Sequence, residues 1–117
     1  MITTKESGDL LEVSIYTQFT LADFREFEQA VGRELKQVPK IRLLLDFTGM
    51  IDYTLDVVWE EIKFSRAHAH DFQRIAVVTP GQWVTWLAWV STTFTDAEVR
   101  IFDDSNLALA WLKAQIE

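Results

Sequence analysis

Residues 41–47, IRLLLDF, form an almost uninterrupted apolar run, and this run constrains the fold more than any other feature of the chain. Such a run is typical of a strand that is covered on both faces, as parallel strands are. Residues 74–78, RIAVV, form a second run, and residues 99–102, VRIF, form a shorter third one. The three runs therefore predict parallel strands in the interior of an α/β domain.

The start of the chain predicts a hairpin. Within residues 10–18, apolar and polar side chains alternate with the period of a strand that has one buried face. Gly8 separates this segment from residues 2–7 and is free to take the positive φ of a tight turn. The first strand is therefore expected to run antiparallel at or near an edge of the sheet.

The first helix is expected to begin after Thr20. This threonine can cap the helix, and Asp23 places a negative charge in the first turn, where it complements the helix dipole. Gly32 within the helix costs about 1 kcal/mol relative to alanine, which suggests that a neighbouring group packs close to it. Pro39 is expected to end the helix, because proline cannot continue one.

Three more helices complete the expected pattern. A loop at 48–54 leads into a helix over 55–70, and a further helix is expected over 82–93. The last helix follows the final strand and is capped by Asp103 or Asp104. The element order ββαβαβαβα predicts an α/β fold with a mixed, mainly parallel five-stranded sheet and four helices.

Composition indicates one ordinary globular domain over residues 1–117, because 49% of the residues are hydrophobic and 25% are charged. The formal net charge of −7 argues against nucleic-acid binding, since phosphates repel an acidic surface. The chain has no cysteine, which excludes disulfides, thiolate metal sites and cysteine nucleophiles. No apolar run approaches the ~20 residues of a membrane span, and the first residues lack the apolar core of a signal peptide, so a cytoplasmic location is expected.

Five segments recur here in a characteristic order and spacing. They are IRLLLDF at 41–47, LDVVWEEIKFSRAH at 55–68, RIAVV at 74–78, AEVRIFDD at 97–104 and ALAWL at 108–112. Together they resemble the SpoIIAA-like family, a group of STAS/SEC14-type domains. The resemblance implies a fold like that of the bacterial anti-sigma-factor antagonists and the SEC14 lipid carriers. It implies little chemistry, because the family is largely uncharacterised.

In the antagonists, a serine or threonine after the central strand is phosphorylated to switch partner binding, near an Asp-Ser-Ser-Gly-like motif. The matching region here, DFTGMIDYTLD at 46–56, contains no such motif. Thr54 is the candidate counterpart of the switch residue, although Tyr53 stands where a small residue is expected. Asp46, Thr48 and Thr54 are therefore candidates for a polar or regulatory site, and the simpler interpretation is that they form turns and caps.

The sequence offers no clear metal site or catalytic group. His68 and His70 are two residues apart, so they do not share a helix face, and Asp71 is the only further ligand type nearby. Acid–base catalysis by histidine needs an orienting carboxylate and a nucleophile in reach, and the sequence identifies neither. We expect no metal, no cofactor and no enzymatic activity.

The helix expected over 82–93 is apolar around most of its circumference. Trp83, Trp86, Leu87 and Val90 share one stripe that the sheet can bury, but Trp89 lies off it. Such a helix is either deeply covered or exposes a patch. The sequence therefore predicts a ligand cleft or homodimer interface formed by the following residues: Trp59, Phe64, Trp83, Trp86, Leu87, Trp89, Val90 and Phe94.

Two functional hypotheses follow. The first is a non-enzymatic domain that binds a small apolar or amphipathic molecule, such as a fatty-acid-like carboxylate, between the second and third expected helices. Its basis is the aromatic helix and the resemblance to lipid carriers. The alternative is a regulatory protein–protein interaction module like the antagonists, in which Thr54 or Thr48 modulates binding of a partner.

Overall fold

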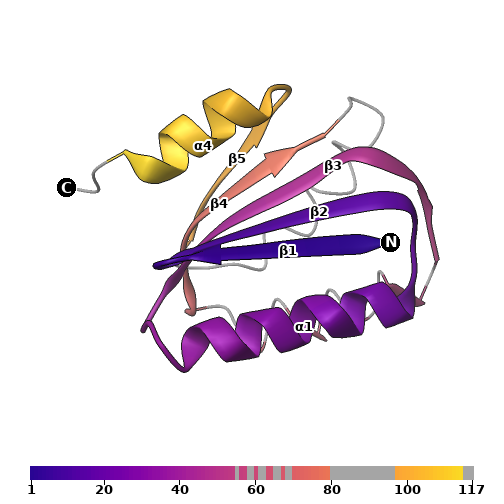
Figure 1. The fold of residues 1–117 in the computed structure, drawn as a ribbon, viewed down its shortest axis with the longest axis horizontal. Coiled ribbons are helices and arrows are strands. Elements are labelled where there is room, and N and C mark those ends of the chain that lie inside the picture. The colour runs from indigo at the N-terminus through magenta and orange to yellow at the C-terminus, as the bar shows by residue number, and fades with distance from the viewer. Residues whose placement is uncertain are drawn as a thin grey trace.

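Five strands form one sheet in the spatial order β1-β2-β3-β4-β5 (Figure 1). This is a computed structural model that describes residues 1–54, 56–57, 60, 63–64, 67, 70–79 and 97–114. The strands are β1 (Ile2–Ser7), β2 (Leu10–Phe19), β3 (Ile41–Tyr53), β4 (Phe72–Val78) and β5 (Glu98–Phe102). The helices with defined bounds are α1 (Leu21–Leu35) and α4 (Ser105–Lys113).

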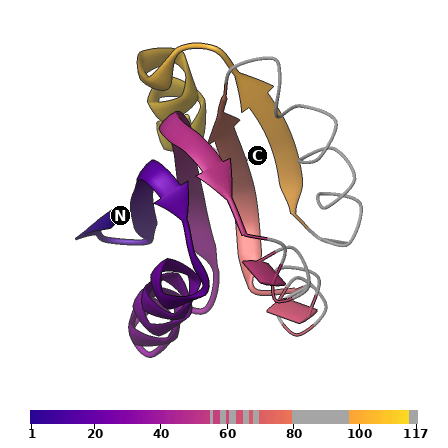
Figure 2. The ribbon, with the colours of Figure 1, turned by 90° about the vertical axis from the view of Figure 1, so that its right-hand side faces the viewer.

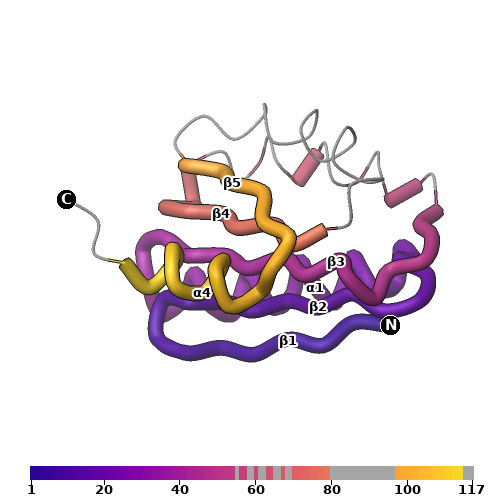
Figure 3. Tube along the Cα trace, turned by 90° about the horizontal axis from the view of Figure 1, so that it is seen from above, coloured from indigo at the N-terminus to yellow at the C-terminus, as the bar shows by residue number. Residues whose placement is uncertain are grey.

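The sheet is mixed. Strand β1 pairs antiparallel with β2, whereas β2–β3, β3–β4 and β4–β5 are parallel pairs. The predicted hairpin is confirmed, with Gly8 at φ 63° in its turn, and β1 lies along the outer margin of the sheet (Figure 3). The expected emphasis on parallel pairing is corrected to a mixed sheet, because β1 pairs antiparallel along its whole length.

The two helices cover opposite faces of the sheet (Figure 1). Helix α1 lies under the larger core, into which it buries Phe24, Phe27 and Val31. Helix α4 buries Ala108 and Leu112 in a smaller cluster against the other face. Both faces of the central strands are therefore covered, which is why their sequences are almost continuously apolar.

Among the described residues, two helices have defined bounds, not the four that the sequence predicts. The helix expected over 82–93 lies outside the described residues. The following described residues of the expected helix over 55–70 are helical: Asp56, Val57, Glu60, Lys63, Phe64 and Ala67. No helix of the described ranges is long and apolar enough to cross a membrane.

The predicted start of α1 is confirmed in detail. The Thr20 hydroxyl accepts the Asp23 backbone N–H at 3.3 Å, and the Asp23 carboxylate accepts the Thr20 N–H at 3.1 Å, which forms a capping box. Burial acts to raise the pKa of Asp23, but hydrogen bonds from Thr20 and from the N-terminal ammonium of Met1 outweigh this effect and lower it.

Two expectations about the rest of α1 are wrong. The helix ends at Leu35 rather than at Pro39, because the amides of Lys36 and Gln37 bond back to carbonyls three residues earlier and tighten the last turn. A methyl group added to Gly32 would meet nothing within 4 Å, so no close neighbour explains this glycine.

The loop expected at 48–54 is also wrong. Strand β3 continues to Tyr53 and pairs with the last part of β2, with two register shifts along the pair. Thr48-Gly49 resembles a turn in sequence, but here it lies within a bulged strand, and Met50 beyond it is buried. The end of β3 therefore curves over the end of β2 and does not leave the sheet (Figure 1).

Candidate functional site at the carboxyl edge of the sheet

The parallel strands β2, β3, β4 and β5 all finish at one edge of the sheet, which faces the viewer in Figure 2. We call it the carboxyl edge, and ligands of open α/β sheets gather at such edges. The opposite edge, where these strands begin, is the amino edge. The carboxylates at or just beyond the ends of β3 and β5 are Asp52, Asp56, Asp103 and Asp104, and Asp46 lies within β3 at its last pair with β4, opposite Val78.

The ends of β2 and β3 form a bulged projection, the β2–β3 tip, which comprises residues 16–19 and 49–53. Thr17 has φ 57°, a left-handed conformation that is uncommon for threonine. Ile51 is the extra residue of one bulge, because its neighbours Met50 and Asp52 pair with successive residues of β2. The bulge and the left-handed residue thus give the ends of β2 and β3 an irregular surface in place of a flat, regular strand pair.

The β2–β3 tip exposes apolar side chains. Ile51 is 74% exposed and Tyr16 is 41% exposed. A Cβ atom added to Gly49 would lie 2.7 Å from the Tyr16 ring and 3.3 Å from the carbonyl oxygen of Ile15. The ring of Tyr16 therefore lies against Gly49, and the absence of a side chain there permits this packing. Sequence reasoning missed both exposed residues, because it treated 48–54 as a loop.

Asp46 and Thr48 form one hydrogen-bonded unit. The Asp46 carboxylate accepts the backbone N–H of Thr48 at 2.9 Å and its hydroxyl at 2.6 Å, both through Oδ1. These bonds fix the bulged backbone that precedes Gly49. Asp46 is half-buried and Thr48 is exposed.

Thr54 lies where β3 passes into the helical residues that follow. Its backbone N–H donates to the carbonyl of Phe19 at 3.1 Å, and its carbonyl accepts the N–H of Val57 at 3.1 Å. Its hydroxyl donates to the carboxylate of Asp56. Like Thr48, this threonine is held by a carboxylate two residues away, at the same edge of the sheet.

The ends of β4 and β5 complete the carboxyl edge. The N–H of Thr79 donates to the carbonyl of Phe102 at 3.2 Å, which ties the two strand ends together. Asp104 caps α4 by accepting the N–H of Asn106 at 2.7 Å and that of Leu107 at 3.4 Å. Of the two caps that the sequence left open, Asp103 and Asp104, the structure selects Asp104.

Phe64 is the one residue of the predicted aromatic interface that lies in the described part of the chain. Its ring is buried in the core, with its centroid 5.8 Å from that of Phe24, 5.0 Å from Phe27 and 6.2 Å from Phe72. Phe64 thus packs as a core residue of the α1 face. The remaining members lie outside the described residues: Trp59, Trp83, Trp86, Leu87, Trp89, Val90 and Phe94.

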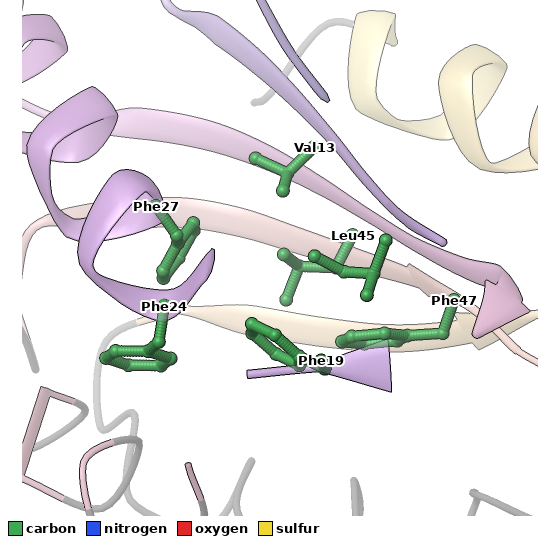
Figure 4. A pocket seen from close by; sticks show the side chains of 7 residues that line it. Val13, Phe19, Phe24, Phe27, Leu45 and Phe47 are labelled. Carbon is green, nitrogen blue, oxygen red and sulfur yellow. The ribbon is translucent and has the colours of Figure 1, made fainter. Parts of the chain in front are cut away.

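A small apolar cavity lies between α1 and the sheet (Figure 4). The cavity is small and has room for roughly one water molecule. The lining side chains are Val13, Ile15, Phe19, Phe24, Phe27, Leu45 and Phe47. A longer ligand would enter this cavity only if the surrounding chains moved apart.

Metal ligands do not gather in the described parts of the chain, which contain no cluster of three or more His, Cys, Asp or Glu side chains able to hold a metal ion. His70 and Asp71 lie at the start of the segment leading into β4, and His68 is outside the described residues.

The mixed five-stranded sheet with helices on both faces defines a small α/β domain of the STAS type. The sequence profile of the SpoIIAA-like family matches residues 10–113, so the chain belongs to the SpoIIAA-like family. It is similar to the crystal structure of an uncharacterised DUF3478-family protein with a SpoIIAA-like fold from Shewanella loihica PV-4. The two are 27% identical with a TM-score of 0.74, over 96% of this chain and 92% of that one. The comparison with curated proteins gives no match.

Proposed function

We propose that this SpoIIAA-like domain is a non-enzymatic protein-interaction module that binds its partner through the β2–β3 tip, at the carboxyl edge of the sheet. The observation that carries the proposal is the β2–β3 tip, where Ile51 is 74% exposed on a shaped, bulged backbone. An exposed apolar patch rimmed by polar residues commonly marks a protein-binding surface, and Tyr16 of the same tip is also exposed. The cytoplasm is the location we propose for this function, in line with the sequence.

The negative charge near Ile51 indicates which kind of partner would bind. Asp46, Asp52 and Asp56 flank Ile51 along the chain, and the whole chain carries a net charge of −7. A partner that offers an apolar side chain between lysine or arginine residues would complement this surface. Because exposed charges are screened by salt, the association should weaken as ionic strength rises.

The two carboxylate-held threonines supply a means of regulation. A phosphate on Thr54 would replace a hydroxyl that donates to Asp56 with a group that only accepts and is negatively charged. The same holds for Thr48 beside Asp46. Repulsion between phosphate and carboxylate would then reshape the backbone on either side of Ile51.

Quantitative affinity capture from cells that naturally produce the protein tests the proposal. Ile51→Ser should remove a partner that the wild-type chain retains, and Thr54→Glu should reduce its recovery. Ile101→Ser is the matched control, because Ile101 is a 39% exposed isoleucine on β5, at the other side of the sheet. A partner recovered equally with Ile51→Ser and wild type, or lost equally with Ile101→Ser, would contradict the assignment of the tip.

A second function, binding of a small apolar or amphipathic molecule, is favoured by the wholly apolar lining of the cavity between α1 and the sheet. The tryptophan-rich segment 83–90 adds to this proposal from sequence. Titration with a fatty acid such as palmitate, followed by tryptophan fluorescence and native mass spectrometry, tests it. Val13→Leu should fill the cavity and weaken binding, and an unliganded mass with unchanged fluorescence would exclude this function.

A further inference from the structure

Glu34 is an acidic side chain buried in the core of the described structure. It lies in the last turn of α1 and is 1% exposed, on the same buried stripe as Phe27 and Val31. Its Oε1 atom is buried and has no hydrogen-bond partner among the described residues. Ionisation would place negative charge on this unsolvated oxygen, which is unfavourable.

The charges around Glu34 make ionisation still less favourable. Burial is the largest cause that raises the pKa of Glu34, and the negative charges of Glu6 on β1 and Asp9 in the β1–β2 turn raise it further. Both of these acids already have arginine partners, Arg33 at 3.6 Å from Glu6 and Arg42 at 3.2 Å from Asp9. The arginines that approach this region are therefore engaged by Glu6 and Asp9, and Glu34 forms no ion pair within the described residues.

The position of Glu34 links two elements. Its side chain belongs to α1, and the acids that face it belong to the β1–β2 hairpin at the margin of the sheet. Its backbone carbonyl also accepts the N–H groups of Gln37 and Val38, at 3.0 and 3.1 Å, as the chain turns toward β3. A negative charge on Glu34 would act on the hairpin turn and on the end of α1 at once.

We propose that Glu34 is a proton-operated latch, whose neutral carboxyl lets the end of α1 pack against the β1–β2 hairpin and whose ionisation loosens that contact. The latch does not depend on partner binding at the carboxyl edge, because it lies at the amino edge. It makes the local stability of the hairpin respond to pH, as a buried acid does when its two protonation states fit the fold unequally.

The sign of the pH dependence follows from the folded protein holding this proton more tightly than the unfolded chain. Below the ordinary pKa of a glutamate, about 4.3, both states are protonated and Glu34 does not affect relative stability. As pH rises above that value the unfolded chain ionises first, so stability falls until the folded carboxyl has also ionised. Glu34→Gln, which cannot ionise, should escape this loss.

Thermal unfolding of the wild type, Glu34→Gln and Glu26→Gln, from about pH 4 to about pH 9, tests the latch. Glu34→Gln should match the wild type at the acidic end and have a Tm several degrees higher than the wild type at the basic end. Glu26 is an exposed residue of the same helix, so Glu26→Gln should follow the wild type throughout. Parallel pH profiles for Glu34→Gln and wild type would overturn the proposal.

Two further measurements use chains that keep Glu34 itself. NMR titration of the Glu34 carboxyl carbon should give a midpoint above the ordinary value, and Glu6→Gln should lower that midpoint by removing one facing charge. Hydrogen exchange at Leu10 and Leu11, corrected for intrinsic rates, should lose protection as Glu34 ionises. A Glu34 midpoint at or below the ordinary value would overturn the proposal even if Glu34→Gln failed to fold.

Discussion

The charged residues near the two edges of the sheet form hydrogen bonds of different range along the chain. Near the amino edge, Arg42 donates to the carbonyl of Leu112 at 2.7 Å, and Arg74 donates to that of Trp111 at 2.6 Å. These arginines neutralise the negative end of α4 and fasten it to the sheet. At the carboxyl edge, the observed bonds of Asp46 and Asp104 reach only amides or hydroxyls within three residues along the chain.

We infer from this contrast that the charged residues near the amino edge support stability, whereas those beside the tip serve recognition. Charges near the amino edge join elements that are distant in sequence, so their loss should destabilise the fold. Asp46 at the carboxyl edge instead fixes the local backbone beside an exposed apolar tip, so its loss should change binding more than stability. Substitutions at the two edges can test whether their charged residues differ in this way.

The largest effect on stability is expected for Arg74→Ala, about 2–3 kcal/mol, because it removes a charged hydrogen bond to the end of α4 and leaves a partly buried space. Arg100→Ala is the matched control. Both guanidinium groups lie over the Trp111 ring, at 4.9 and 5.2 Å from its centroid, but only Arg74 donates to the Trp111 carbonyl. Equal losses in chemical denaturation would show that the carbonyl bond adds nothing.

Gly49→Ala should cost about 1–2 kcal/mol, because its Cβ would collide with the Tyr16 ring and crowd the Ile15 carbonyl. Tyr16→Ala in the same chain should recover part of the loss by removing the ring. A double-mutant cycle measured by urea unfolding gives the coupling between the two sites. Full additivity would mean that the ring does not pack on Gly49.

Asp46→Ala should cost about 1 kcal/mol, the usual value for losing side-chain hydrogen bonds to the local backbone. Thr48→Val removes only the hydroxyl bond, so its effect should be the smaller of the two. Thermal unfolding can compare these variants directly with Arg74→Ala. A loss at Asp46 as large as that at Arg74 would contradict the contrast between the edges.

The smallest effect on stability is expected for Ile51→Ser, within about 0.5 kcal/mol, because the side chain is largely in water already. The same substitution should have the largest effect on partner recovery. A Tm that falls by more than about 2–4 °C would indicate that Ile51 supports the fold, and the proposed role of the tip would then lose its basis.

The sequence alone predicts the strands, caps and turns that are determined by local patterns of residues. The apolar runs at 41–47 and 74–78 are strands, Thr20 caps α1 as expected, and Gly8 adopts positive φ. These features depend on periodicity or on the geometry of a single residue. They need no knowledge of distant contacts, so a single sequence suffices to predict them.

The predictions from sequence are wrong where hydrogen bonds to a segment distant in the chain determine the local structure. Residues 48–53 have turn-like chemistry but become strand because β2 supplies hydrogen bonds along their length. The site residues Tyr16 and Ile51 depend on that pairing, so they could not be found without it. Glu34 is different: it follows Phe27 and Val31 at helical spacing, so its place on the buried stripe could have been read from the sequence.

The outer strand β1 carries a further consequence for assembly. Within the described structure it has a neighbour on one side only, and its six residues pair with β2 without a bulge (Figure 3). A regular strand of this kind is a template onto which another chain can add. Lys5 lies in the middle of β1, so an antiparallel copy that places Lys5 opposite Lys5 would bring two ammonium groups close together. Repulsion between the two lysines would disfavour that register of pairing between molecules.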